Sequence, residues 1–145
     1  MRIAEVMTRN PRAIGVNETL HQAAELMDRL DVGSLPVCDG CRLVGVITDR
    51  DITVRATADG AAPDTTTVAE AMTDDVRWCF EDDDVREAER IMRQTQIRRV
   101  PVLDRTRRLV GILTLGDLAA KGAAQGAHDV ADTLDVISQP PQPDR

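Results

Sequence analysis

A threonine and an aspartate three positions further on occur twice in the chain, each time after a short apolar run. Thr48 and Asp51 form the first pair, and Thr114 and Asp117 form the second. Each apolar run contains β-branched residues and predicts a buried strand, so that the aspartate falls in the first turn of a following helix. A hydroxyl and a carboxylate then lie side by side at the carboxyl end of a strand. This arrangement suits a site that holds a polar ligand. It does not suggest a nucleophile, because no base accompanies the hydroxyl.

The composition limits the class of protein. A chain of 145 residues forms one domain or two small units that share a core, and 42% apolar residues are enough for that core. Trp78 and Phe80 are the only aromatic residues. The interior must therefore consist of Val, Ile, Leu, Met and Ala.

The charge balance argues against general nucleic-acid binding. Eighteen basic residues against 25 acidic ones give a net charge of −7, which repels a phosphate backbone. All the basic residues except Lys121 are arginines. Since arginine binds phosphate and carboxylate groups with a planar fork of donors, a local cationic pocket is compatible with the acidic chain.

The N-terminal residues and the cysteines indicate a cytoplasmic protein. Met1 is followed by Arg2-Ile3-Ala4-Glu5 without an apolar leader, and no window approaches the ~18 apolar residues of a membrane span. Three cysteines are an odd number, which does not suggest a secreted disulfide framework. We therefore expect a soluble protein without membrane attachment.

Three blocks of sequence recur in the same order. Residues 3–8 return as residues 68–73, and Pro36-Val37 returns as Pro101-Val102, both at a shift of 65 positions. The strand that precedes each Thr/Asp pair returns at a shift of 66, so one residue has been inserted before it. Three matched blocks in one order indicate duplication. The predicted divisions are repeat one at 1–60, a linker at 61–67, repeat two at 68–122, and a short helix and terminal tail at 123–145.

Each repeat predicts the order strand, helix, strand, strand, helix. Asn17 is a plausible N-cap for the first helix, whose apolar positions have helical spacing. The corresponding positions of the second repeat form a weaker stripe, and the acidic triplet 82–84 fits a helix start better than a cation site. The apolar positions are Leu20, Ala23, Ala24, Met27 and Leu30 in the first helix, and Val85, Ala88, Met92 and Thr95 in the second.

Two hairpins and two further helices complete the prediction. Asp39-Gly40 is a turn signal within the first hairpin. The predicted extended segments are 12–16 and 76–80, the hairpin strands are 35–38 with 43–48 and 100–103 with 109–114, and the closing helices are 49–58 and 116–121. Residues 127–137 have Val130, Leu134 and Ile137 at helical spacing, and 139–143 form a proline-rich tail. The fold class is α/β (α+β), with two pseudo-symmetric β-α-β-β-α units packed face to face through their sheets.

These residues resemble the CBS (cystathionine β-synthase) domain, here as a tandem pair that covers about residues 3 to 120. The short length and the cysteine after Pro-Val are most similar to small stand-alone bacterial pairs of the hypoxic-response-protein type. The motifs that carry the resemblance are Met7-Thr8 and Met72-Thr73, Leu35-Pro36-Val37 and Val100-Pro101-Val102, and residues 45–51 with 111–117.

The resemblance implies a sensor of adenosine-containing ligands. Pairs of this family bind AMP, ADP, ATP, S-adenosylmethionine or related molecules in one or both of two clefts where the repeats meet, and they commonly form disc-like homodimers. Such a ligand is regulatory, so no cofactor is required. The resemblance leaves the downstream protein partner open.

The chemistry of the Thr/Asp pair agrees with this implication. An ionised carboxylate only accepts hydrogen bonds and can take both hydrogens of a vicinal diol, such as the ribose hydroxyls. The threonine hydroxyl can donate to a phosphate oxygen, and a helix N-terminus favours the same anion.

The family's site residues can be carried over to matching positions of this chain. The first cleft should then use Thr48, Asp51, Val46, Val32, Gly33, Thr73 and Arg77. The second cleft should use Thr114, Asp117, Ile112, Ile97, Arg98, Thr8 and Arg12. Arg98, Arg99 and Arg50 are the expected phosphate partners. Because Gly33 occupies the position that matches Arg98, we expect the second cleft to be the better phosphate site.

Other interpretations of the same residues stay open. The threonines could be ordinary strand-end residues and the aspartates ordinary first-turn acids. The pair Arg98-Arg99 could form a surface ion pair or a dimer contact instead of binding phosphate. The chain would then be a dimerisation or scaffold module with vestigial clefts.

The cysteines offer a third interpretation. Cys38 and Cys41 have CxxC spacing, and Cys79 is the third thiol. Zinc would need a fourth ligand, and only His21 and His128 are available, so we expect no metal site. A redox switch is the alternative, although a small buried Cys38 and an exposed turn thiol at Cys41 fit the hairpin better.

Catalysis has no support in the sequence. There is no Walker loop, Gly-x-Gly-x-x-Gly, His-Glu-x-x-His or Gly-x-Ser-x-Gly motif. We therefore expect a binding module and not an enzyme.

Overall fold

The computed structural model of the chain describes residues 1–120 and divides into two compact units. Unit 1 contains residues 1–11, 77–106 and the described part of the chain from residue 110 onward, and unit 2 contains residues 12–76 and 107–109. The first eleven residues therefore belong with the second predicted repeat. The compact units divide the chain by contacts in space and not by repeated sequence. They therefore do not test the predicted boundaries of the two sequence repeats.

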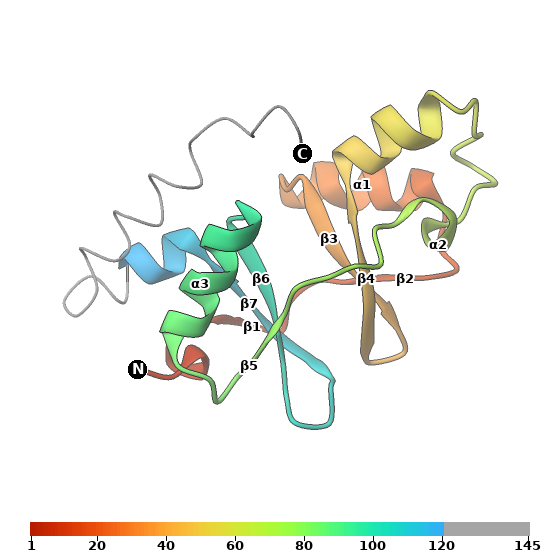
Figure 1. Ribbon diagram of the computed structural model, residues 1–145. Coiled ribbons are helices and arrows are strands. Elements are labelled where there is room, and N and C mark those ends of the chain that lie inside the picture. The colour runs from red at the N-terminus through yellow and green to blue at the C-terminus, as the bar shows by residue number, and fades with distance from the viewer. Residues whose placement is uncertain (121–145) are drawn as a thin grey trace. The chain divides into compact units, whose positions relative to one another are not determined.

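Unit 2 is a three-stranded sheet with helices packed on it (Figure 1). The sheet order is β2-β3-β4, with β2 parallel to β3 and β3 antiparallel to β4. Its elements are β2 (Ile14–Gly15), α1 (Leu20–Leu30), β3 (Ser34–Asp39), β4 (Arg42–Thr48), the π-helix η2 (Asp51–Thr57) and α2 (Val68–Ala71). Side chains of α1 and of the two hairpin strands form one core, which includes Leu20, Met27, Leu35, Val37 and Ile47.

Helix α1 is present as predicted, but it begins two residues later, at a different cap. Thr19, and not Asn17, is the N-cap: its hydroxyl accepts the Gln22 N–H, and the Gln22 side chain accepts the Thr19 N–H. This reciprocal capping box satisfies two backbone donors that the helix leaves unpaired. The prediction of Ala24 on the buried face is also wrong, since Ala24 is exposed. At the other end, Asp31 adopts a left-handed conformation with φ of 54°, which stops the helix.

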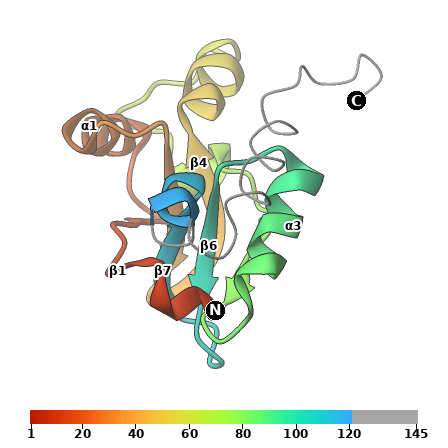
Figure 2. The same ribbon diagram turned by 90° about the vertical axis from the view of Figure 1, so that its left-hand side faces the viewer.

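Unit 1 has a four-stranded sheet in the order β1-β7-β6-β5, and α3 lies alongside β6 (Figure 2). Its elements are the short 3₁₀-helix η1 (Ile3–Glu5), β1 (Thr8–Arg9), β5 (Cys79–Phe80), α3 (Val85–Thr95), β6 (Arg99–Leu103), β7 (Leu109–Thr114) and a helix over residues 115–120. The core is aliphatic and includes Ile3, Met92, Val100, Val102, Leu113 and Leu118.

The acidic triplet opens α3, as predicted. Asp84 is the N-cap and accepts the Arg86 N–H, and Asp83 accepts the Phe80 N–H at 2.9 Å. The bond from the Arg86 N–H holds the pKa of Asp84 below its ordinary value. Asp82 forms an ion pair with Arg105, whose guanidinium also lies over the Phe80 ring.

The opening segment of each repeat joins the sheet that the other repeat builds. Strand β1 pairs antiparallel with β7, which places Thr8 opposite Ile112 and Arg9 opposite Gly111. In unit 2, Thr73 makes the corresponding bridge to Val46 of β4. We call this arrangement the exchange of opening segments. It adds β1 to the three strands that the repeat predicts for the sheet of unit 1.

The remaining predictions concern the linker, the closing helices and the C-terminus. Residues 61–67 are fastened to α1, because the N–H groups of Leu20 and His21 donate to the carbonyls of Thr66 and Pro63. The predicted helix 49–58 is present, but most of it has π-type winding. The predicted helix at 127–137 and the tail at 139–143 lie outside the described residues. Among residues 1–120, no helix has the length and apolar character needed to cross a membrane.

Candidate functional site

The Thr/Asp pair of unit 2 is held together by reciprocal hydrogen bonds where β4 ends. The Thr48 N–H donates to Asp51 Oδ2, and the Asp51 N–H donates to Thr48 Oγ1, both at 3.0 Å. The two bonds fix both side chains at the first turn of the following helix. Asp51 is only 5% exposed.

The pair in unit 1 has the same geometry at the end of β7. The Thr114 N–H donates to Asp117 Oδ2 at 3.1 Å, and the Asp117 N–H donates to Thr114 Oγ1 at 3.0 Å. Asp117 is half-buried. The predicted strand exit with an adjacent hydroxyl and carboxylate is therefore present in both units.

A second threonine reaches each aspartate from the exchanged segment. The Thr73 hydroxyl donates to Asp51 Oδ1 at 3.3 Å, and the Thr8 hydroxyl donates to Asp117 Oδ2 at 3.5 Å. The resemblance assigned both threonines to these sets, and the structure brings each of them to its aspartate. Each carboxylate thus accepts one threonine hydroxyl and one backbone N–H.

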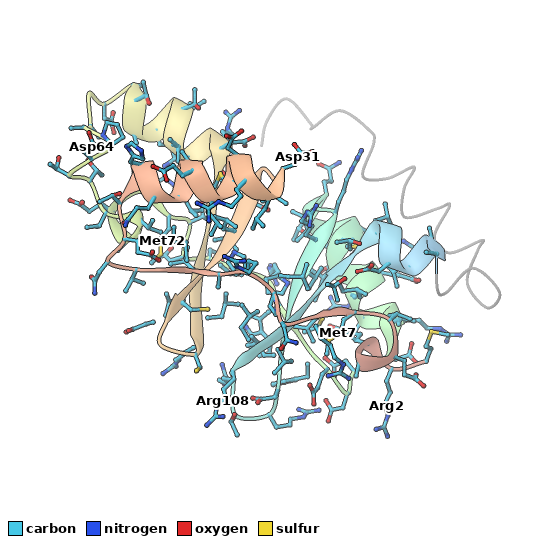
Figure 3. The ribbon with its side chains drawn as sticks, turned by 180° about the vertical axis from the view of Figure 1, so that it is seen from behind. Arg2, Met7, Asp31, Asp64, Met72 and Arg108 are labelled. Carbon is cyan, nitrogen blue, oxygen red and sulfur yellow. The ribbon has the colours of Figure 1, made fainter. Side chains whose placement is uncertain are left out.

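Two glycines let the exchanged segments approach the strands. A Cβ atom at Gly45 would lie 2.7 Å from Met72 Sδ and 2.9 Å from the Thr73 carbonyl oxygen. At Gly111 the corresponding distances are 2.5 Å to Met7 Sδ and 3.0 Å to the Thr8 carbonyl oxygen. Figure 3 labels Met7 and Met72, the two side chains that occupy this space. Glycine is therefore required at both positions to place the second threonine.

Arg55 lies beside the unit 2 pair, and the sequence analysis missed it. Its Nη1 lies 3.4 Å from Asp51 Oδ1, one helical turn further along the chain. The residue four positions after an aspartate on a helix was a readable signal for such an ion pair. Because 57% of the Arg55 side chain is exposed, this pair is screened by water and can open at little cost.

The other predicted site residues flank these pairs. Val46 and Ile112 lie on the pairing strands, and Val32 and Ile97 pack partly buried against their cores. The glycine and the arginines of the set are exposed: Gly33, Arg12, Arg50, Arg77, Arg98 and Arg99. Arg77 belongs to unit 1 and Arg12 to unit 2, each in the opposite unit from the Thr/Asp pair of its predicted set. Their place at the clefts stays a prediction.

The cysteines do not form a ligand set in the described part of the chain. All three are free thiols, with Cys38 and Cys79 buried and Cys41 exposed in the hairpin turn. Within residues 1–120, no three side chains of the types His, Cys, Asp or Glu cluster in a way that could hold a metal ion.

We expect Cys41 to react quickly with a maleimide at pH 8, and Cys38 and Cys79 to react only after unfolding. Burial raises the pKa of Cys38, and burial with the nearby Asp83 and Glu87 raises the pKa of Cys79 to about 12, so both stay protonated. Peptide mass spectrometry after timed labelling measures each site. Fast labelling of Cys38 together with Cys41 in the folded chain would restore the redox-switch interpretation.

Comparisons with known proteins agree with the repeats. A model of the CBS domain matches residues 3–56 and 68–123. Hypoxic response protein 1 from Mycobacterium tuberculosis is 39% identical over 116 residues, which are 79% of this chain and 80% of that protein. The CBS domain-containing protein YhcV from Bacillus subtilis is 38% identical over 117 residues, which are 81% and 82% of the two chains.

Solved structures share the fold. A crystal structure of Hypoxic Response Protein I with two coordinated zinc ions has a TM-score of 0.77 and 36% identity, covering 83% of this chain and 98% of that one. CBSX2 in complex with AMP has a TM-score of 0.71 at 27% identity, covering 86% and 96%. The CBS pair of MJ0100 with 5′-methylthioadenosine and S-adenosyl-L-methionine has a TM-score of 0.72 at 29% identity, covering 86% and 98%.

Proposed function

Because the chain belongs to the CBS domain family and carries this domain twice, we propose that it is a stand-alone regulatory module for an adenosine-containing ligand. The module binds an adenine nucleotide or an S-adenosylmethionine-type ligand without turning it over. The observation that carries the proposal is the carboxylate of Asp51 or Asp117 at a strand exit, held by the backbone N–H of one threonine and the hydroxyl of a second.

The chemistry of this group fits a ribose. An ionised carboxylate accepts both hydrogens of a vicinal diol, and hydrogen bonds to a charged acceptor are stronger than neutral ones. When the diol binds the carboxylate, the hydroxyl of Thr73 or Thr8 leaves it and can turn its hydrogen toward a ligand oxygen. The AMP complex of CBSX2 and the adenosyl complex of MJ0100 support the same ligand class.

Occupancy acts by shifting an equilibrium between arrangements of the two repeats or between monomer and homodimer. A ligand shifts such an equilibrium only through different affinities for the two states. The proposal includes a homodimer and a cytoplasmic location, where the three free thiols stay reduced.

Thermal unfolding with AMP, ATP, 5′-methylthioadenosine and S-adenosylmethionine tests the proposal. At ligand concentrations about 100 times Kd, binding to the folded state adds about 2.7 kcal/mol, which is a shift of several degrees for a chain of this size. Extraction of the denatured protein followed by mass spectrometry identifies any co-purified ligand. If none of the four compounds raises the Tm and none co-purifies, the chain is a scaffold module and the proposal fails.

A further inference from the structure

The surroundings of the two Thr/Asp pairs differ at structurally matched positions. The Asp49 N–H donates to the Gly33 carbonyl at 2.9 Å in unit 2, and the Leu115 N–H donates to the Arg98 carbonyl at 2.9 Å in unit 1. In both units this bond joins the residue after the threonine to the residue just before the Pro-Val strand. Gly33 therefore corresponds to Arg98, and Asp49 corresponds to Leu115.

In unit 2 the position beside the pair is acidic. A Cβ atom at Gly33 would lie 3.1 Å from Asp49 Oδ2, so the Asp49 carboxylate extends over the space that a side chain at position 33 would enter. Asp49 is exposed and can contact a ligand. Two carboxylates, those of Asp49 and Asp51, thus flank Thr48.

In unit 1 the same position is basic. Arg98 is exposed, whereas Leu115 is buried at 8% exposure and belongs to the aliphatic core. Arg98 thus places a basic residue at the position that matches Gly33, which the Asp49 carboxylate covers in unit 2. Arg98 and Asp49 carry charges of opposite sign.

We infer that Asp49 sets the ligand class of the unit 2 site, which takes an adenosyl compound without a phosphate group. This inference rests on the proposed function. The phosphate of AMP is repelled by Asp49, whereas a neutral thioether or a cationic sulfonium at the 5′ position is not. The unit 1 site takes the 5′-phosphorylated nucleoside, because the Arg98 fork suits phosphate.

Two cations oppose this inference. Arg55 lies 3.4 Å from Asp51 Oδ1, where it pairs with that carboxylate. Arg50 follows Asp49, is exposed, and has the uncharged Gly116 as its counterpart in unit 1. The hydrogen bond from the Asp49 N–H to the Gly33 carbonyl fixes the backbone of Asp49 beside the Thr48/Asp51 pair. The variant Arg50→Gln tests whether this guanidinium binds the phosphate.

Isothermal titration of the Asp117→Ala chain isolates the unit 2 site. We expect this chain to bind 5′-methylthioadenosine at least tenfold more tightly than AMP. Adding Asp49→Asn is expected to raise the affinity for AMP about tenfold. The reason is that it removes the repulsion between the Asp49 carboxylate and the phosphate, at about 5 Å in a partly hydrated site. The affinity for 5′-methylthioadenosine should stay within about twofold. Asp39→Asn removes the same charge at the far end of β3, about 17 Å away, and should change neither affinity.

The outcomes separate this inference from the proposed function. If 5′-methylthioadenosine binds but Asp49→Asn leaves the affinity for AMP unchanged, the inference is wrong and the proposed function stands. Tight AMP binding that Arg50→Gln abolishes would assign phosphate recognition to Arg50 and also overturn the inference. If no adenosyl compound binds the native chain, both are wrong.

Discussion

Asp117→Ala will lower the affinity for AMP about 100-fold, because it removes two charge-assisted hydrogen bonds, each worth about 1.5 kcal/mol or more. Asp117 is half-buried and accepts the Thr114 N–H at 3.1 Å and the Thr8 hydroxyl at 3.5 Å. Because water can reach these partly buried donors, the free chain should lose only about 1 kcal/mol of stability. Isothermal titration measures the affinity, and thermal unfolding without ligand measures the stability.

Two further variants control this prediction. Asp82→Ala removes an acid of the same unit that pairs with Arg105, and it should not change the affinity for AMP. Asp51→Ala should destabilise the free chain by about 1–3 kcal/mol, because it leaves buried donors without their acceptor. If Asp117→Ala binds AMP as the native chain does, Asp117 does not hold the ribose of this ligand.

Gly111→Ala will destabilise the chain by about 1–3 kcal/mol, the usual cost of overpacking a filled site. The added methyl group would lie 2.5 Å from Met7 Sδ and 3.0 Å from the Thr8 carbonyl oxygen. The methionine side chain can shift, but the carbonyl belongs to β1, which pairs with β7. Chemical denaturation with unchanged m-values measures the loss of unfolding free energy.

Gly116→Ala is the matched control for this substitution. A Cβ atom at Gly116 meets only Thr114 Oγ1, at 3.6 Å, which is an ordinary contact. In the first helical turn, alanine should leave stability unchanged or raise it. Equal losses for Gly111→Ala and Gly116→Ala would show that the close approach of the opening segment is not the cause.

The sequence predicted the elements whose signals are local. The two hairpins, the presence of α1 and the Thr/Asp pairs at the strand ends all follow from apolar runs, turn residues and helical spacing. The error at Asn17 was avoidable, because Thr19 and Gln22 form a readable capping box. Glu18 accepts the Gly15 N–H, which keeps the residues before Thr19 in a turn.

Other features depend on distant residues and carry no local signal. The exchange of opening segments rests on contacts between residues about a hundred positions apart, such as Thr8 and Asp117, and only the family resemblance indicated it. The π-type winding of η2 also has no signature in composition. The role inferred for Asp49 depends on matching its backbone bond to Gly33 with the bond of Leu115 to Arg98, and a linear sequence does not contain these bonds.

The most direct test of the account is titration of the native chain with AMP and with its 2′-deoxy analogue. If the carboxylate holds both ribose hydroxyls, loss of one hydroxyl should weaken binding at least tenfold, since one hydrogen bond to a charged group is worth about 1.5–3 kcal/mol. The chain that carries both Asp51→Ala and Asp117→Ala should then show no preference between the two compounds. Equal affinity of the native chain for AMP and 2′-deoxy-AMP would contradict the central claim that these aspartates hold the sugar.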